Sequence, residues 1–144
     1  MLKWGRVSLS GRPPSNNHIY KPNGFGGIYL TKEGKALKEM YRWEYRVAYK
    51  GAPMTGPIRI KVAYIFEDNR TRDYDNYTKL WQDAATGIIW KDDKQIFDAR
   101  VFKLVDKNNP RIEVFYEELE RVPGIDDIDF LRTLPHDVAE ADNL

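Results

Sequence analysis

Acidic side chains gather at two places in the second half of the sequence, and their types could hold a divalent metal ion. Asp73 and Asp75 are separated by one residue, and Asp92 and Asp93 are adjacent further along the chain. Carboxylates held close together repel each other unless a cation or a proton separates them. Mg²⁺ prefers a few carboxylate oxygens and keeps bound waters for catalysis and for substrate phosphate. The pattern therefore predicts a magnesium site at Asp73 and Asp75, completed by Asp92 or Asp93 if the fold brings that turn near.

The same aspartates also have a purely structural interpretation. Asp73 or Asp75 could cap the start of a helix, and Asp75 could pair with Lys79 one turn later on the surface. His18 and His136 are the only histidines and lie far from this region in sequence, so a histidine-rich zinc site is not expected. The residue types alone leave metal binding and helix capping both open.

The element that must position these groups is a helix predicted over residues 74–86 and stopped by Gly87. Its apolar residues recur at three- and four-residue steps and predict a buried face: Tyr77, Leu80, Trp81, Ala84 and Ile88. On a continuous helix, Asp75 and Lys79 lie about 40° apart around the axis. Asp73 precedes the helix, where the helix dipole favours negative charge. We therefore expect the carboxylates and Lys79 on the exposed face.

The remaining patterns predict an α+β fold, a small mixed β-sheet with two main helices packed against it. A second helix begins at the N-cap Thr31 and ends before Gly51. Strands are expected at residues 3–9, 57–66, 95–105 and 111–116. The turn at 108–110 predicts that the last two strands form an antiparallel hairpin. The order β-α-β-α-β-β then favours a mixed sheet covered by helices.

The composition excludes several classes of protein. The chain has 144 residues and no cysteine, which rules out disulfides, thiolate zinc sites and cysteine nucleophiles. The start of the chain lacks the apolar stretch of a signal peptide, and no stretch approaches the roughly 20 apolar residues of a membrane span. We therefore expect a soluble, cytoplasmic protein with no membrane partner.

The net charge of +1 conceals two parts of opposite sign. Residues 1–116 carry 21 basic and 13 acidic side chains, and residues 117–144 carry two basic and nine acidic ones. A basic body favours a polyanionic partner, although a solvated surface with an unrelated tail has the same composition. We expect one domain over residues 1–118 and an acidic, mobile tail over 119–144, which could bind a protein partner or act as an electrostatic brake over a basic groove.

The wider pattern around the aspartates resembles the RusA family of Holliday junction resolvases. Three motifs carry this resemblance, in the family's order and spacing over about residues 7–116. The first two are Pro13-Pro14-Ser15-Asn16-Asn17 and Thr31-x-Glu33-Gly34. The third is Arg70-x-Arg72-Asp73-x-Asp75-Asn76-x-x-Lys79, followed by Asp83 and then Asp92-Asp93-x-Gln95-Ile96.

The resemblance implies a homodimeric α+β endonuclease that needs Mg²⁺ or Mn²⁺ and cuts four-way DNA junctions by paired symmetric nicks. It implies that Asp73, Asp75 and Asp93 are the metal-binding carboxylates and that Lys79 is an essential lysine, with Asp92 as a supporting ligand of lower rank. Two alternatives are a less selective nuclease for flaps or forks, and a DNA-binding module that does not catalyse. Because all three carboxylates and the lysine are retained together, the catalytic interpretation is preferred.

Basic and amide side chains flank the aspartates and are expected to contact DNA phosphates. They are Arg70, Arg72, Lys91, Lys94, Arg12, Asn16 and Asn17. Tryptophans could stack on unpaired bases at a junction. Trp81 lies on the apolar helical stripe and is expected in the core or at a dimer interface, whereas the sequence does not decide the role of Trp90.

Overall fold

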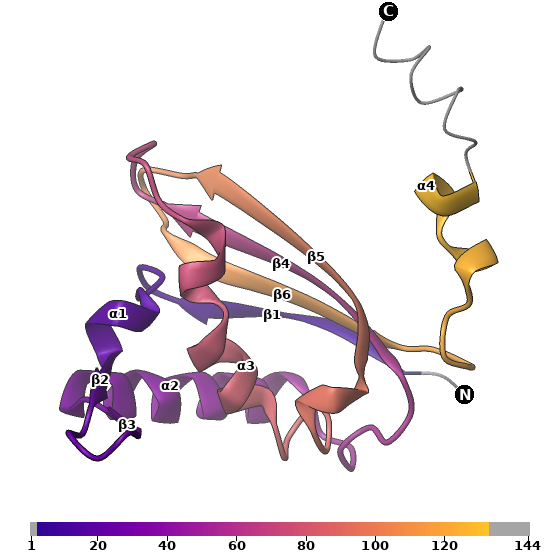
Figure 1. The fold of residues 1–144 in the computed structure, drawn as a ribbon, viewed down its shortest axis with the longest axis horizontal. Coiled ribbons are helices and arrows are strands. Elements are labelled where there is room, and N and C mark those ends of the chain that lie inside the picture. The colour runs from indigo at the N-terminus through magenta and orange to yellow at the C-terminus, as the bar shows by residue number, and fades with distance from the viewer. Residues whose placement is uncertain (1–2, 133–144) are drawn as a thin grey trace, which may run out of the picture.

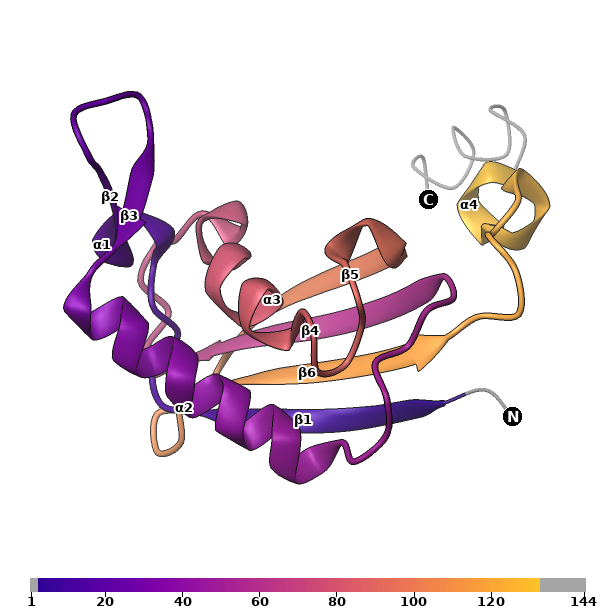
Figure 2. The ribbon, with the colours of Figure 1, turned by 90° about the horizontal axis from the view of Figure 1, so that it is seen from below.

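The computed structural model describes residues 3–132, and a four-stranded mixed sheet forms its centre. The strands are β1 (Trp4–Ser10), β4 (Ile58–Phe66), β5 (Ile96–Val105) and β6 (Arg111–Glu118). They lie in the order β1-β6-β4-β5, with β4 parallel to β5 and β6 antiparallel to both β1 and β4. Figures 1 and 2 show the main helices on one face of this sheet. The predicted α+β class is therefore confirmed.

Two main helices cover that face. They are α2 (Lys32–Ala48) and α3 (Lys79–Ala85). Thr31 caps α2 as predicted, because its Oγ1 accepts a hydrogen bond from the Gly34 N–H at 3.1 Å. Figure 2 shows α2 running along the β1 side of the sheet and α3 lying over the other half. The four-stranded sheet with α2 and α3 is called the platform below, and the shorter elements lie around it.

The shorter elements gather at the ends of the platform. Before α2 come the helix α1 (Asn16–Ile19) and the hairpin of β2 (Tyr20–Pro22) and β3 (Ile28–Leu30). The 3₁₀ helices are η1 (Tyr74–Tyr77), η2 (Asp93–Gln95) and η3 (Ile125–Asp127), and the last described helix is α4 (Asp129–Arg132). Of these elements, α1, η1 and η2 carry residues that the sequence marks as functional: Asn16 and Asn17 on α1, Asp75 on η1, and Asp93 and Lys94 on η2.

The core lies between the sheet and the two main helices, and three of its aromatic residues are joined by hydrogen bonds inside it. The Tyr45 hydroxyl donates to the Trp81 carbonyl at 2.9 Å, and the Trp81 Nε1–H donates to the Tyr64 hydroxyl at 3.1 Å. Trp81 is therefore a core residue, as expected. Trp90 is also fully buried. This placement keeps both rings away from an unpaired base.

The predicted hairpin between the last two strands is wrong. The turn at 108–110 is present, but β4 lies between β5 and β6, so these two strands do not pair. The α3 crossover places β5 parallel to β4 on one edge, which leaves the other edge of β4 for β6. In that position β6 buries Ile112, Val114 and Tyr116 in the core. Burial beneath the helices therefore outweighs the short-range pairing that the turn favours.

The predicted continuous helix over residues 74–86 is also wrong in one respect. The buried face is as expected, but the segment divides into η1 and α3 with Thr78 between them. The geometry assumed for Asp75 and Lys79 therefore does not apply.

The end of the chain departs from the sheet after β6. The Leu119 N–H donates to the Pro57 carbonyl at 2.8 Å, and beyond it the chain forms the exposed η3 and α4, drawn in yellow tones in Figure 1. Residues 133–144 lie outside the described residues, so the proposed mobility of the tail stays a prediction. Within residues 3–132, no helix is long and apolar enough to cross a membrane.

Candidate metal and nucleic-acid site

The loop that delivers Asp73 is held by Arg72. The Arg72 side chain is only 9% exposed and forms an ion pair with Asp68 at 2.9 Å. Its guanidinium stacks over the Phe66 ring at 4.2 Å and donates to the carbonyls of Asp68 and Arg70. The hydrogen bond from the Arg70 N–H lowers the pKa of Asp68, and Arg72 lowers it further. These contacts fix the backbone between the end of β4 and Asp73.

Asp73 and Asp75 share the first turn of η1 and are both exposed. The Asn76 N–H donates to the Asp73 carbonyl at 3.2 Å, and the Thr78 hydroxyl donates to the Asp75 carbonyl at 3.1 Å. Backbone contacts therefore order the turn. Within residues 3–132, neither carboxylate has a hydrogen bond or an ion pair, and Asp73 makes no side-chain cap contact. Two free carboxylates on one ordered turn provide the hard oxygen donors that Mg²⁺ prefers.

The second acidic pair divides into two roles. Asp92 caps η2, since its Oδ1 accepts from the Lys94 N–H at 2.9 Å while Gln95 Oε1 accepts from the Asp92 N–H at 2.8 Å. The Lys94 N–H lowers the pKa of Asp92. Asp93 instead faces α3, where its Oδ2 accepts from Gln82 Nε2 at 3.2 Å. Asp92 therefore caps its own turn, whereas Asp93 contacts the side of α3.

The described part of the chain does not gather the three predicted carboxylates into one cluster. No group of three or more histidine or carboxylate side chains in residues 3–132 lies close enough to hold a metal ion. The fold joins Asp73 to Asp75 on η1 and joins Asp93 to α3 through Gln82. The donor types fit Mg²⁺, while the full ligand set of Asp73, Asp75 and Asp93 stays a prediction.

Lys79 is the first residue of α3 and follows Asp75 by four positions in the sequence. Its Nζ lies 3.3 Å from Asp83 Oδ2, whereas no ion pair joins it to Asp75 in the described structure. The Lys79 N–H donates to Asn16 Oδ1 at 3.4 Å, so the N-terminal motif reaches the start of α3. Asn16 was expected to contact phosphate, and the structure also gives it this structural contact.

The other side chains predicted to contact DNA differ in their solvent exposure and in their ion pairs. Arg12 pairs with Glu67 at 2.9 Å, and Arg70 pairs with Asp68 at 3.4 Å, but both guanidinium side chains remain largely exposed. Lys91 and Lys94 are exposed on either side of the acidic pair, and Asn17 is exposed on α1. These groups are accessible to a polyanion, whereas most of Arg72 is not.

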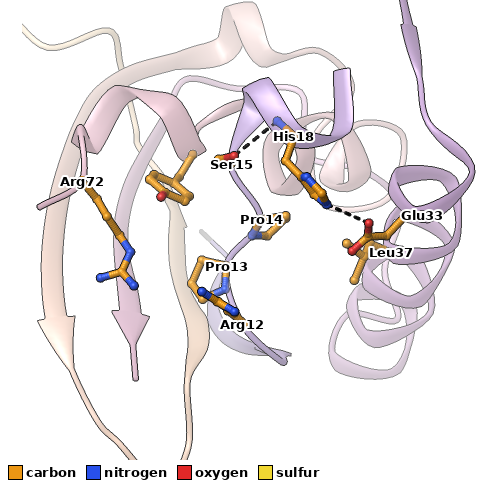
Figure 3. A pocket seen from close by; sticks show the side chains of 9 residues that line it. Arg12, Pro13, Pro14, Ser15, His18, Glu33, Leu37 and Arg72 are labelled. Carbon is orange, nitrogen blue, oxygen red and sulfur yellow. Dashed lines mark hydrogen bonds and ion pairs between the residues drawn. The ribbon is translucent and has the colours of Figure 1, made fainter. Parts of the chain in front are cut away.

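A cavity of about 490 Å³ connects the N-terminal motif with the Asp73 loop (Figure 3). Arg12, Pro13 and Pro14 face Arg72 across it. On its other side His18 Nε2 lies 2.8 Å from Glu33 Oε2, which joins α1 to α2. The cavity therefore borders both the segment that bears Asn16 and the segment that leads to Asp73.

Comparison with known proteins places this architecture in a family. Residues 10–117 match the family model described as Endodeoxyribonuclease RusA. The chain belongs to the RusA family. It is 32% identical over 108 residues to crossover junction endodeoxyribonucleases RusA of Escherichia coli strain K12, Shigella sonnei and Enterobacteria phage 82. This similarity covers 74% of the chain and 89% of each relative.

The RusA match includes every residue that the sequence marks as a site residue. It begins just before Arg12 and ends at Glu117 on β6, so it takes in both acidic pairs and Lys79. Residues 118–144 fall outside it. The resemblance predicted from the motifs is therefore confirmed at the level of the family.

Two polar partners in this RusA-family chain were not predicted as site residues. Gln82 binds Asp93, and Tyr20 donates to Asp83 Oδ2 at 3.1 Å. Gln82 follows Lys79 by three residues, so helical spacing places it on the same face of the predicted helix, but no sequence pattern pairs it with Asp93. Tyr20 lies 63 positions from Asp83, so no local pattern could pair them.

Proposed function

We propose that this chain is a Mg²⁺-dependent endonuclease that resolves four-way DNA junctions by paired, symmetric nicks, with Mn²⁺ as a substitute metal. Membership of a family whose relatives are named crossover junction endodeoxyribonucleases supports the substrate class. The observation that carries the chemistry is the pair of carboxylates at the start of η1, Asp73 and Asp75, which have no hydrogen bond or ion pair within residues 3–132 and are followed in sequence by Lys79 at the start of α3. Such a pair is stabilised by a bound cation.

Asp73, Asp75 and Asp93 are the residues proposed to hold the metal. When bound, Mg²⁺ supplies Lewis-acid polarisation of the scissile phosphate and a water of lowered pKa. Lys79 follows η1 at the start of α3, and its ammonium is assigned the task of stabilising negative charge that develops on the phosphate. Arg72 contributes indirectly, because its guanidinium fixes the loop before Asp73.

Phosphate contacts are assigned to the accessible cations around this site. Arg12, Arg70, Lys91 and Lys94 have exposed side chains that can bind the DNA backbone without reading its sequence. The basic body, from residue 1 to 116, attracts the polyanion over a longer range. Affinity is therefore expected to fall steeply as salt rises.

A homodimer is proposed to form through β5. This strand lies at one edge of the sheet and, within residues 3–132, pairs only with β4. Along its ten residues Phe97, Phe102, Leu104 and Val105 are all about half exposed. A long apolar edge strand is an unfavourable surface for a monomer and is covered when a second copy pairs with it. A two-fold axis at this edge would give two identical sites, as paired cuts in opposing strands require.

The experiment that tests the proposal incubates the protein with synthetic four-way, forked and linear DNA, with Mg²⁺ or with EDTA. We expect symmetric nicks in the four-way substrate only when metal is present. Asp73→Asn should bind the junction but not cut it, because an amide is a weaker metal ligand than a carboxylate. Equal cutting of linear duplex would point to a less selective nuclease, and binding without cutting by the wild type would leave only a binding module.

A further inference from the structure

Two side chains outside the predicted site hold the ammonium of Lys79 from different directions. Asp83 follows Lys79 by one turn of α3, and its Oδ2 lies 3.3 Å from Lys79 Nζ. Tyr20 lies on β2, and Lys79 Nζ stands 5.2 Å from the centre of its ring. The Tyr20 hydroxyl donates to the same Asp83 Oδ2 at 3.1 Å. The three groups therefore form a closed triangle.

We propose that Asp83 and Tyr20 are positioning residues that hold Lys79 for the cleavage reaction. This inference rests on the proposed function, because it assigns a task to the neighbours of the lysine used there. Neither residue is placed on the metal or on the DNA. Both act through Lys79, and the name Lys79 clamp is used below for Tyr20, Lys79 and Asp83.

The chemistry of lysine explains why a clamp is useful. Its ammonium is a point charge on a flexible four-carbon stem, so a free lysine samples many positions. An ion pair alone fixes a distance but permits rotation about it. In this clamp the carboxylate fixes the distance and the aromatic face restricts the direction from which the cation approaches. Precise placement of a charged group next to a reacting phosphate has a large effect on rate.

The clamp is also anchored to the rest of the site at both ends of the lysine. The Lys79 N–H donates to Asn16 Oδ1, in the segment that immediately precedes Tyr20 on β2. One N-terminal segment therefore contacts the backbone of Lys79 through Asn16 and its ammonium through Tyr20. Partial burial, and then the charge of Asp83, raise the pKa of Tyr20. A phenol is protonated near neutral pH even at its ordinary pKa, and the raised pKa keeps Tyr20 a donor to Asp83 in alkaline solution as well.

A purely structural role is the competing explanation. Tyr20 and Asp83 could simply attach the β2–β3 hairpin to α3, in which case any loss of activity would come from a loosened fold. If Tyr20 and Asp83 only attach the hairpin to α3, losing either contact should lower the cleavage rate by the same factor whether or not Lys79 is present. A positioning role disappears when there is no ammonium to position. The two explanations can therefore be separated by a double-mutant cycle.

The experiment measures single-turnover cleavage of a four-way junction at saturating enzyme and Mg²⁺. Asp83→Asn and Tyr20→Phe should each slow cleavage, Asp83→Asn by about 10- to 100-fold. Junction affinity in EDTA and the thermal midpoint should stay close to wild type. In the Lys79→Ala background, adding Asp83→Asn should cause no further loss. Tyr29→Phe, an exposed tyrosine on the partner strand of the same hairpin, is the matched control and should cut at the wild-type rate.

Each outcome has a distinct meaning. If Asp83→Asn slows cleavage equally with and without Lys79, the positioning role is overturned although the proposed function survives. If the wild-type protein does not cut junctions, the proposed function is overturned. If Lys79→Ala cuts at the wild-type rate, the role proposed for Lys79 in cleavage is overturned. The NMR chemical shift of the Tyr20 ζ-carbon at neutral pH checks the contact itself, because Asp83→Asn replaces the carboxylate that accepts from this phenol and should shift the signal. An unchanged shift would contradict the clamp.

Discussion

Arg72 shows at the residue scale how one charged side chain can serve the fold rather than the ligand. The sequence places it among other cations beside an acidic motif, where a phosphate contact is the natural expectation. The structure buries nine-tenths of its side chain between the Phe66 ring and Asp68. Burial of this kind depends on the path of the loop after β4, which no local pattern specifies.

Replacing Arg72 should therefore cost stability. We expect Arg72→Met to lower the free energy of unfolding by about 2 kcal/mol, because it removes a partly buried ion pair and two hydrogen bonds to loop carbonyls. Urea denaturation measures this change. The control is Arg70→Met, whose exposed side chain should matter by less than about 0.5 kcal/mol. Equal effects of the two substitutions would show that Arg72 does not hold the loop.

The Gln82–Asp93 hydrogen bond offers a second test at this scale. If Asp93 is a metal ligand, Gln82 orients it from α3. We expect Gln82→Ala to raise the Mg²⁺ concentration needed for half-maximal cleavage by about 10-fold, the size of effect seen when a residue that orients a metal ligand is lost. The thermal midpoint should change little, since the pair is exposed. An unchanged metal dependence would remove Asp93 from the proposed ligand set or leave Gln82 without a role.

At the scale of elements, the sequence predicted the helices and strands better than their connections. The strand at residues 57–66 and the cap at Thr31 were both predicted from local patterns, and both are confirmed. The pairing of β6 depends on which surface the helices bury, so the turn at 108–110 gave the wrong partner. The break at Thr78 was likewise missed, because the buried face of residues 74–86 keeps helical spacing through η1 and α3. The carboxylate motif could be found from sequence, whereas the contacts of Tyr20 and Gln82 could not.

The loop from β4 to η1 should be sensitive to acid through Asp68. Its folded pKa is lower than that of an ordinary carboxyl, so its contribution to stability is present above the ordinary range and is lost as pH falls through the lowered value. We expect Asp68→Asn to melt below wild type at neutral pH. The difference in melting temperature between the two proteins should disappear as the pH falls below about 4. A gap that stays constant over this range would show that the charge of Asp68 does not support the loop.

At the scale of the whole molecule, the free edge of β5 should decide the oligomeric state. We expect the wild type to sediment as a dimer in analytical ultracentrifugation. Phe102→Lys should shift it to monomer, because a charged side chain blocks pairing along an edge strand. Trp4→Lys is the control, since Trp4 is exposed on β1 at the opposite edge. Loss of the dimer in the Trp4 variant but not in the Phe102 variant would place the interface elsewhere.

The central claim is that this molecule makes two coordinated cuts across one four-way junction. A supercoiled plasmid with an extruded cruciform tests it most directly, because two cuts made before release linearise the plasmid, whereas single independent nicks only relax it. With Mg²⁺ we predict that linear product appears without prior accumulation of nicked circles, and that EDTA or Asp73→Asn abolishes it. Accumulation of nicked circles as the main product, or cutting of a plasmid that lacks the cruciform, would contradict the account.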